Sequence, residues 1–481
     1  MPVFSLLLIL IIIYVLTSSK TQIDKLYDLF ILACALRIYW FQGYFLKIGD
    51  SEIANLGAVV EVFFSAYAIY LIYINTIKIK RVYVILFLSF ALINLLGIIL
   101  EIIFPYDGML LVEQSAGYDW DALVVGKCNM HNYYPTIFDY TKPYCSLLQF
   151  AFNIVLLKHV YNKGKFAKAY LKVIKIIKFG VYYGLFEFIV KNILGNTTLT
   201  YDISALLVGV NEVSVYKEAF MKNGLYTLQG LTREPSHFNC FLFTYIFLAM
   251  LGNTILKHFK EYVKYKTYGN VSIFTAVFLL LFSGGFSAVW YLFVLALSYF
   301  VLRKNNDLKL RRYITSKMII NLLFALIVAT VIIYAILQND YIYGRLQDAF
   351  MIIDYLEDVD NVAVLAVLGG NEGVGSTVAR FFSTYTGIVI FLNRPLFGLG
   401  YSLQFMHSFS AMLLANMGLI GTYSVYRLLG FSNHRKYDAL LMFVVFIIGG
   451  LPITIAPLGL SMHWLLIFEA TTYYKTDYCH V

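Results

Sequence analysis

The chain has 481 residues, of which 60% are hydrophobic and 14% charged, with a formal net charge of +9 and a mean hydropathy of +0.73. This composition is too apolar for an ordinary soluble globular protein. The basic segments lack interleaved aromatic residues and any nucleic-acid-binding motif, so a nucleic-acid partner is excluded. The cysteine and histidine spacings fit no metal site, and we expect no metal or other cofactor.

Apolar runs long enough to cross a bilayer as helices dominate the sequence. They predict an all-α, polytopic membrane protein with about 12 or 13 transmembrane helices in a single domain, residues 1–481. The first run, Val3 to Leu16, lacks a charged leading segment and a small-residue cleavage site, which indicates a retained helix. The predicted helices cover residues 3–19, 26–45, 56–77, 81–104, 145–160, 173–194, 235–256, 269–283, 286–302, 318–338, 408–426, 438–451 and 457–473.

Lysine and arginine concentrate in loops that fall on one side if these helices alternate. The basic loops are Lys78–Arg81, Lys158–Lys178, Lys257–Lys266, Arg303–Lys317 and Arg427–Lys436. Such a bias marks the cytoplasmic side, which places the N-terminus outside and the C-terminus inside. Attraction to anionic lipid headgroups is sufficient to explain this charge.

Three long segments project from the opposite, extracytoplasmic side: 105–144, 195–234 and 339–407. Long loops between membrane helices are commonly functional, and we expect the site there. In the third, apolar residues at helical spacing over Arg345–Leu356 predict an amphipathic helix lying on the membrane. Cys128 lies in the first segment and Cys145 directly follows it, so the two could pair on the outer side, but two free thiols are favoured over a disulfide.

The stretch Gly230–Asn239 places an arginine and a glutamate directly before a long apolar run. Pro235 suits the first helical position, which puts Glu234 near the N-cap and Arg233 just outside the helix. A helix N-terminus carries unpaired amides and a partial positive charge, so this position predicts a phosphate or pyrophosphate site.

A second set of motifs lies farther along the chain: Ser283–Ser287, Gly375–Arg380, Asn393–Gly400, His407–Ser410 and Gly418–Gly421. Gly398 and Gly400 permit a tight backbone path that delivers His407 to the outer end of the next helix. Ser408 is the candidate N-cap of that helix. A second helix N-terminus therefore faces the same side as Arg233 and Glu234.

Taken in order, the motifs over about residues 230–425 resemble the O-antigen polymerase and ligase superfamily. These are bacterial GT-C-like membrane glycosyltransferases with about twelve helices and long periplasmic loops, acting on polyprenyl-pyrophosphate-linked sugars. In many members an asparagine follows the histidine, whereas in this chain Ser408 follows His407. The resemblance implies a bacterial inner-membrane location with the active site facing the periplasm or outside, and a flippase and a chain-length regulator as further partners.

Arginine suits the leaving pyrophosphate because its planar fork stays protonated and binds phosphate bidentately. We therefore expect Arg233 and Arg380 to hold the pyrophosphate without a metal. Glu234 or His407 would accept the proton of the attacking sugar hydroxyl, and the sequence leaves this choice open. Each of these residues also has a structural interpretation as an ion pair, a solvated loop charge or a helix cap.

Further candidates for binding the undecaprenyl-pyrophosphate-linked oligosaccharide or membrane lipids are Arg37, Ser236, His237, Arg345, Arg394 and Tyr401. Arg37 lies inside a predicted membrane helix, where a charge usually faces a cavity or a partner. Two interpretations stay open for it: a lipid phosphate, or an ion pair with Glu61 or Glu101.

The sequence thus predicts a polymerase of lipid-linked oligosaccharide repeat units for O-antigen or capsular-type polysaccharide. A ligase that transfers the finished glycan to a lipid or protein acceptor shares the same donor chemistry. A flippase or transporter is the alternative from another class, but inverted repeats and short loops would be expected there.

Overall fold

The computed structural model describes residues 3–38, 44–48, 51–106, 137–160, 163–208, 221–222, 225–232, 235–255, 262–283, 387–400 and 408–429, with the single residues 288, 291, 292, 295 and 384. These parts of the chain are mostly helical, as predicted. The helices predicted at 318–338, 438–451 and 457–473, most of 286–302, and the surface helix predicted at 345–356 lie outside the described residues.

The helices are α1 (Val3–Thr17), α2 (Gln22–Ile38), α3 (Leu56–Tyr73), α4 (Arg81–Ile103), α6 (Ile137–His159), α7 (Lys163–Phe188), α8 (Leu199–Val208), α9 (Pro235–Ile255), α10 (Tyr262–Phe282) and α16 (Phe409–Leu429). A π-helical turn, η1 (Ile189–Ile193), continues α7. Two antiparallel hairpins pair β1 (Tyr44–Ile48) with β2 (Ser51–Asn55) and β3 (Met221–Lys222) with β4 (Leu225–Tyr226).

Several boundaries differ from the predicted ones. Helix α6 begins eight residues before position 145, α7 ten residues before 173, and α10 seven residues before 269. Hydropathy detects the apolar part of a helix and misses polar turns that extend beyond it. Helix α2 ends at Ile38 instead of 45, because the chain turns into the β1–β2 hairpin, which the sequence analysis did not predict.

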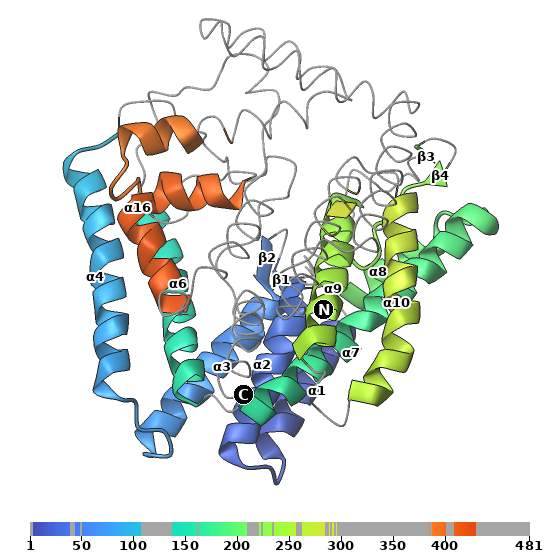
Figure 1. Cartoon of the computed structure of the whole chain (residues 1–481), viewed down its shortest axis with the longest axis horizontal. Coiled ribbons are helices and arrows are strands. Elements are labelled where there is room, and N and C mark those ends of the chain that lie inside the picture. The colour runs from blue at the N-terminus through green and yellow to red at the C-terminus, as the bar shows by residue number, and fades with distance from the viewer. Residues whose placement is uncertain are drawn as a thin grey trace, which may run out of the picture.

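The helices form a row in which each packs against its neighbours (Figure 1). At one side α9 and α10 pack on α7, which packs on α2; α3 and α6 then connect to α4 and α16 at the other side. Helix α1 packs against α2 and α8. The core is aromatic and aliphatic, with Phe30, Phe64 and Tyr170 among its largest fully buried side chains.

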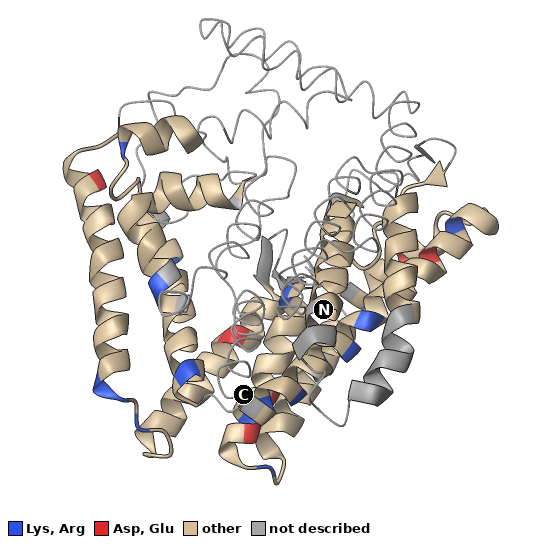
Figure 2. Ribbon diagram, in the orientation of Figure 1, with Lys and Arg blue, Asp and Glu red and all other residues tan. Residues whose placement is uncertain are grey.

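One end of this row, termed here the basic end, joins the α1–α2 turn to the start of α7. Lys165 pairs with Asp24 at 2.7 Å, and Lys172 pairs with Asp28 at 3.2 Å. Hydrogen bonding to Lys165 lowers the pKa of Asp24, and hydrogen bonding to Asp28 raises the pKa of Lys20. Many of the lysines and arginines drawn in Figure 2 lie toward this end.

The far ends of α6 and α16 are also joined, because Lys158 donates to the backbone oxygen of Leu428. Lys158 and Arg427 both belong to loops predicted on the cytoplasmic side, and the structure places Lys158 against Leu428, the residue after Arg427.

Two of the described helices, α3 and α4, are long and apolar enough to cross a membrane, and four other apolar helical stretches are shorter. The outward face of α4 exposes large apolar side chains, including Leu88, Leu92 and Ile102, each more than half exposed. Such a face is unfavourable in water and favourable in hydrocarbon.

Helix α16 is interrupted at Gly418, whose φ of 60° and ψ of −169° suit essentially only glycine. The interruption removes helical partners from backbone groups on either side of it, and residues 395–400 supply replacements. Leu399 N donates to Ala415 O (3.0 Å), Gly400 N to Asn416 O (2.7 Å), Leu419 N to Pro395 O (2.8 Å) and Ile420 N to Leu396 O (3.0 Å). The two halves of α16 run in different directions (Figure 1).

Steric contacts explain why glycine occupies positions 398 and 418. A Cβ atom on Gly418 would lie 2.4 Å from the carbonyl carbon of Leu396, and one on Gly398 would lie 2.5 Å from the oxygen of Ala415. Because backbone meets backbone at both positions, neither neighbour can move away as a flexible side chain would.

We predict that Gly418→Ala lowers stability much more than Gly195→Ala. Both glycines have positive φ, but a Cβ on Gly195 would meet nothing within 4 Å. Gly195→Ala should therefore cost about 1–2 kcal/mol for backbone strain alone, and Gly418→Ala about 2 kcal/mol more for overpacking. Thermal unfolding of the detergent-purified variants measures the difference; equal losses would contradict the proposed backbone contact.

Candidate functional site

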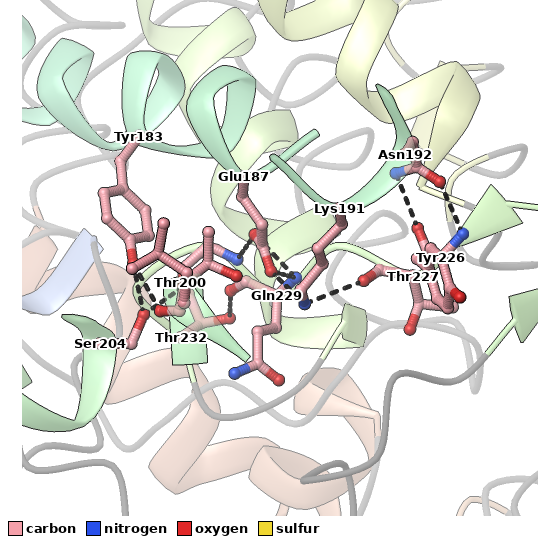
Figure 3. Close-up of polar contacts among 12 residues, drawn as sticks. Tyr183, Glu187, Lys191, Asn192, Thr200, Ser204, Tyr226, Thr227, Gln229 and Thr232 are labelled. Atoms are coloured by element: carbon pink, nitrogen blue, oxygen red, sulfur yellow. Dashed lines mark hydrogen bonds and ion pairs between the residues drawn. The ribbon is translucent and has the colours of Figure 1, made fainter. Parts of the chain in front are cut away.

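A buried ion pair lies at the end of α7 that is opposite the basic end. Lys191 Nζ is 2.6 Å from Glu187 Oε1, with the two side chains 8% and 1% exposed (Figure 3). A buried pair is stable only when additional hydrogen bonds offset the desolvation of both charges.

The backbone before α9 supplies those hydrogen bonds. Glu187 Oε2 accepts from the amides of Gly230 at 2.6 Å and Gln229 at 3.2 Å. Lys191 also donates to the carbonyl oxygen of Thr227 at 3.4 Å. The Glu187 carboxylate therefore has three donors, and the segment 227–230 is fastened to α7.

Asn192 and Tyr183 extend this attachment to both sides. Asn192 accepts from the amide of Tyr226 at 2.7 Å and donates to its carbonyl at 3.3 Å. The Tyr183 hydroxyl bonds Ser204 of α8 at 2.7 Å, and Ser204 in turn donates to the carbonyl of Gly230 at 3.3 Å. We call Tyr183, Glu187, Lys191, Asn192 and Ser204 the polar clamp.

The π-helical turn η1 is part of the polar clamp. It contains both Lys191 and Asn192, and its wider turn changes which residues point toward segment 226–232. Single π-helical turns are rare and occur frequently at functional sites.

Apolar packing fixes the start of α9 against the same segment. The ring of Phe238 fits between two glycines: a Cβ on Gly184 would lie 2.3 Å from Cζ, and one on Gly230 would lie 2.5 Å from Cδ2. Gly230 also has a φ of 58°, which glycine adopts without strain. The first turn of α9 is thus seated on α7.

These contacts lead directly to the first predicted motif. Leu228, Leu231 and Thr232 are buried, at 2% exposure or less. Pro235 is the first residue of α9, as predicted. Arg233 and Glu234, between Thr232 and Pro235, lie outside the described residues.

The second predicted helix start is also present. The Ser408 hydroxyl accepts from the amide of Ala411 at 3.2 Å, which confirms Ser408 as the N-cap of α16. His407, immediately before it, lies outside the described residues.

Both helix starts lie away from the basic end. Helix α7 begins at the basic end, so its other terminus, which holds Thr232 through the polar clamp, is distant from it. Helix α16 ends at Leu429 near the basic end, because Leu428 accepts from Lys158 and the neighbouring Val160 accepts from Tyr27 of α2. Its break at Gly418 lies at the other end of α6, because Gly400 contacts both Asn416 and Tyr140, and Ser408 precedes that break. The described residues next to the two motifs are therefore on the same side of the helix row.

Arg37 makes one of the ion pairs considered from the sequence. Its Nη2 is 2.7 Å from Glu61 Oε2, whereas Glu101 accepts from the amide of Tyr106 at 2.8 Å. The pair with Glu61 is thus confirmed over the pair with Glu101, and a lipid-phosphate role for Arg37 stays a prediction.

The remaining predicted residues are dispersed or undescribed. Arg394 donates to the carbonyl of Phe104, and His237 is buried in the first turn of α9. Ser236 lies in the same turn, but its side chain is outside the described part. Arg345, Arg380 and Tyr401 also lie outside the described residues. Cys145 is a free thiol, the favoured interpretation.

The sequence analysis missed Glu187 and Lys191. A signal was present, because an acid and a base four residues apart within the apolar run 173–194 indicate a functional or structural pair. Among the residues that the structure describes, no group of three or more His, Cys, Asp or Glu side chains is placed to hold a metal ion.

Comparisons of the chain with protein-family models, with curated proteins and with solved structures found no match.

We predict that Glu187→Gln destabilises the protein by about 3–5 kcal/mol, because it leaves the buried Lys191 ammonium without its counter-charge. The double variant Glu187→Gln/Lys191→Met should recover part of this loss. Lys172→Gln, which removes a half-exposed pair, should cost about 0–1 kcal/mol.

Unfolding measurements on Glu187→Gln, Lys191→Met and the double variant form a double-mutant cycle for the pair. Additive losses, with no coupling between the two positions, would show that the Glu187–Lys191 pair does not stabilise the site.

Proposed function

We propose that the protein is a multi-pass membrane glycosyltransferase that polymerises polyprenyl-pyrophosphate-linked oligosaccharide repeat units. It would act on the periplasmic or outer face of a bacterial cytoplasmic membrane, with about 12 or 13 transmembrane helices. Support for the membrane location comes from the two long apolar helices, α3 and α4, and from the apolar outward face of α4.

The observation that carries the proposal is the construction of two helix starts on one side of the molecule. Thr232, just before Arg233, is buried behind the polar clamp, and Ser408, just after His407, caps α16. A site that stabilises developing charge needs such rigid support, because preorganised groups require no reorganisation during the reaction. Two of the sequence motifs, Arg233–Glu234 and His407, therefore directly adjoin backbone that the structure holds in place.

In the proposed reaction, a hydroxyl of the fresh lipid-linked repeat attacks the anomeric carbon of the growing chain. The new carbon–oxygen bond forms as the bond from that carbon to the pyrophosphate oxygen breaks, and the electron pair leaves with the pyrophosphate. Arg233 and Arg380 hold this leaving group. Glu234 or His407 takes the hydroxyl proton.

A transporter of the same lipid-linked sugars is the second candidate, because α16 is interrupted within its length. Discontinuous helices commonly form substrate sites in transporters, where their ends face the ligand. In α16, however, residues 395–400 occupy the backbone groups on both sides of Gly418. Those groups are therefore engaged within the protein, which favours the glycosyltransferase. A glycan ligase is a further alternative, which uses the same donor chemistry but transfers the glycan to a different acceptor.

We predict that Arg233→Ala and Arg380→Ala abolish chain extension while the protein level in the membrane is unchanged. Arg→Lys at each position should also impair extension, because an ammonium does not reproduce the bidentate fork. Removing one such donor typically lowers the rate by about 10²–10³. Arg81→Lys, at the exposed first residue of α4, is the matched control and should retain full activity.

Glycan ladders from cells, normalised to membrane protein level, provide the measurement. Normal extension with lysine at both positions would refute the pyrophosphate assignment.

We further predict that purified protein mixed with lipid-linked repeats in detergent, without any ion gradient, produces a ladder of longer glycans. Electrophoresis of the released glycans detects the ladder. Unchanged single repeats that nevertheless move between leaflets in reconstituted vesicles would favour transport. Transfer of preformed long glycan to a non-repeat acceptor would favour the ligase.

A further inference from the structure

The exposed side of α7 and η1 is one continuous stripe whose chemistry changes abruptly. Its members recur at alternating spacings of four and three residues, which keeps them on one side of a helix. In chain order they are Lys168, Lys172, Lys175, Phe179, Tyr182, Phe186, Ile189 and Ile193, all exposed. The first three are lysines and the following five are aromatic or aliphatic.

The opposite side of the same helix shows no such change. On this side, Phe166, Tyr170 and Ile174 are buried at the level of the lysines, and Val181 is buried at the level of the apolar half. Helix α7 packs there on α2, α9 and α10. The change from lysine to apolar residues is therefore a property of the surroundings of the protein and not of its core.

The length of the apolar half fits a membrane. From Ile176, exposed beside the first apolar turn, to Ile193 the helix rises about 26 Å. The hydrocarbon core of a bilayer is about 30 Å thick. The boundary between Lys175 and Phe179 then corresponds to the level at which hydrocarbon gives way to headgroups. Lys178, one turn before Tyr182, has its Nζ 5.2 Å from the centre of that ring, which is typical of this level.

Most of the lysine charge is not neutralised by the protein. Asp28 faces Lys172 but is shared with Lys20, and Asp24 faces Lys165. Within the described part of the chain, Lys168 and Lys175 form no ion pair. Lys168 and Lys175, without an ion pair among the described residues, and the exposed Lys172, which shares Asp28 with Lys20, form a row of ammonium groups at headgroup level. Such a row is complementary to lipid phosphates.

We propose that Lys168, Lys172 and Lys175 form a binding site for anionic phospholipid headgroups of the inner leaflet. The acyl chains lie along the apolar half of the stripe, so one lipid contacts both halves. This site rests on the membrane location proposed above but not on glycosyl transfer.

The test compares how phosphatidylglycerol and phosphatidylcholine stabilise the detergent-purified full-length protein. Phosphatidylglycerol should raise the apparent Tm of the wild type more than phosphatidylcholine does. The triple variant Lys168→Gln/Lys172→Gln/Lys175→Gln should lose most of this difference, because each lysine contributes about fivefold to binding. Native mass spectrometry of retained phosphatidylglycerol measures the affinity directly.

Three controls separate the proposed site from general charge effects. The triple Lys→Arg variant keeps the charges and should keep the response. Lys175→Gln should weaken binding. Lys142→Gln should not, because Lys142 is exposed near the start of α6, away from the end that carries Lys158. The response should also disappear at about 1 M salt, where the Debye length is about 3 Å.

An equal phosphatidylglycerol response in the wild type and the triple Lys→Gln variant would overturn the proposal. A response reproduced by inorganic phosphate alone would overturn the assignment to a lipid. If the triple variant does not fold, the contrast between Lys175→Gln and Lys142→Gln decides. Loss of glycan extension with an unchanged lipid response would affect only the proposed function.

Discussion

The proposed site depends on the contacts of one buried group, the carboxylate of Glu187. It is nearly fully buried, yet it meets an ammonium from its own helix and two amides from the segment before α9. A buried charge is stable only when its hydrogen-bonding capacity is satisfied, and here the donors come from parts of the chain about forty residues apart. Satisfying one carboxylate thus fixes segment 227–230, a few residues before α9 begins at Pro235.

A similar requirement shapes the break within α16. The interruption at Gly418 frees backbone groups that would be costly in an apolar environment, and residues 395–400 satisfy them through their own backbone. Side-chain identity matters little in such an arrangement, whereas the absence of a Cβ at Gly398 and Gly418 is essential. The two glycine-containing motifs noted in the sequence are therefore two halves of one backbone structure.

Features with a local cause were predictable from the sequence. The positions of α3, α4 and α9, the role of Pro235 as first helical residue and the Ser408 cap follow from apolar runs and capping chemistry. The polar turns of α7, the β1–β2 hairpin and the break in α16 depend on tertiary contacts that no single segment encodes. The polar clamp was missed because Glu187 and Lys191 gain meaning only from the amides of distant residues. The choice between Glu61 and Glu101 for Arg37 likewise required spatial proximity.

The joint between residues 395–400 and the two halves of α16 has a mechanical consequence. Four backbone hydrogen bonds cross between them, two on each side of Gly418. Residues 395–400 and 408–420 are consequently held together as one unit. Bending at Gly418 alone would break several of these backbone hydrogen bonds at once. A displacement of residues 395–400 would therefore carry with it the half of α16 that begins at Phe409, together with its cap at Ser408.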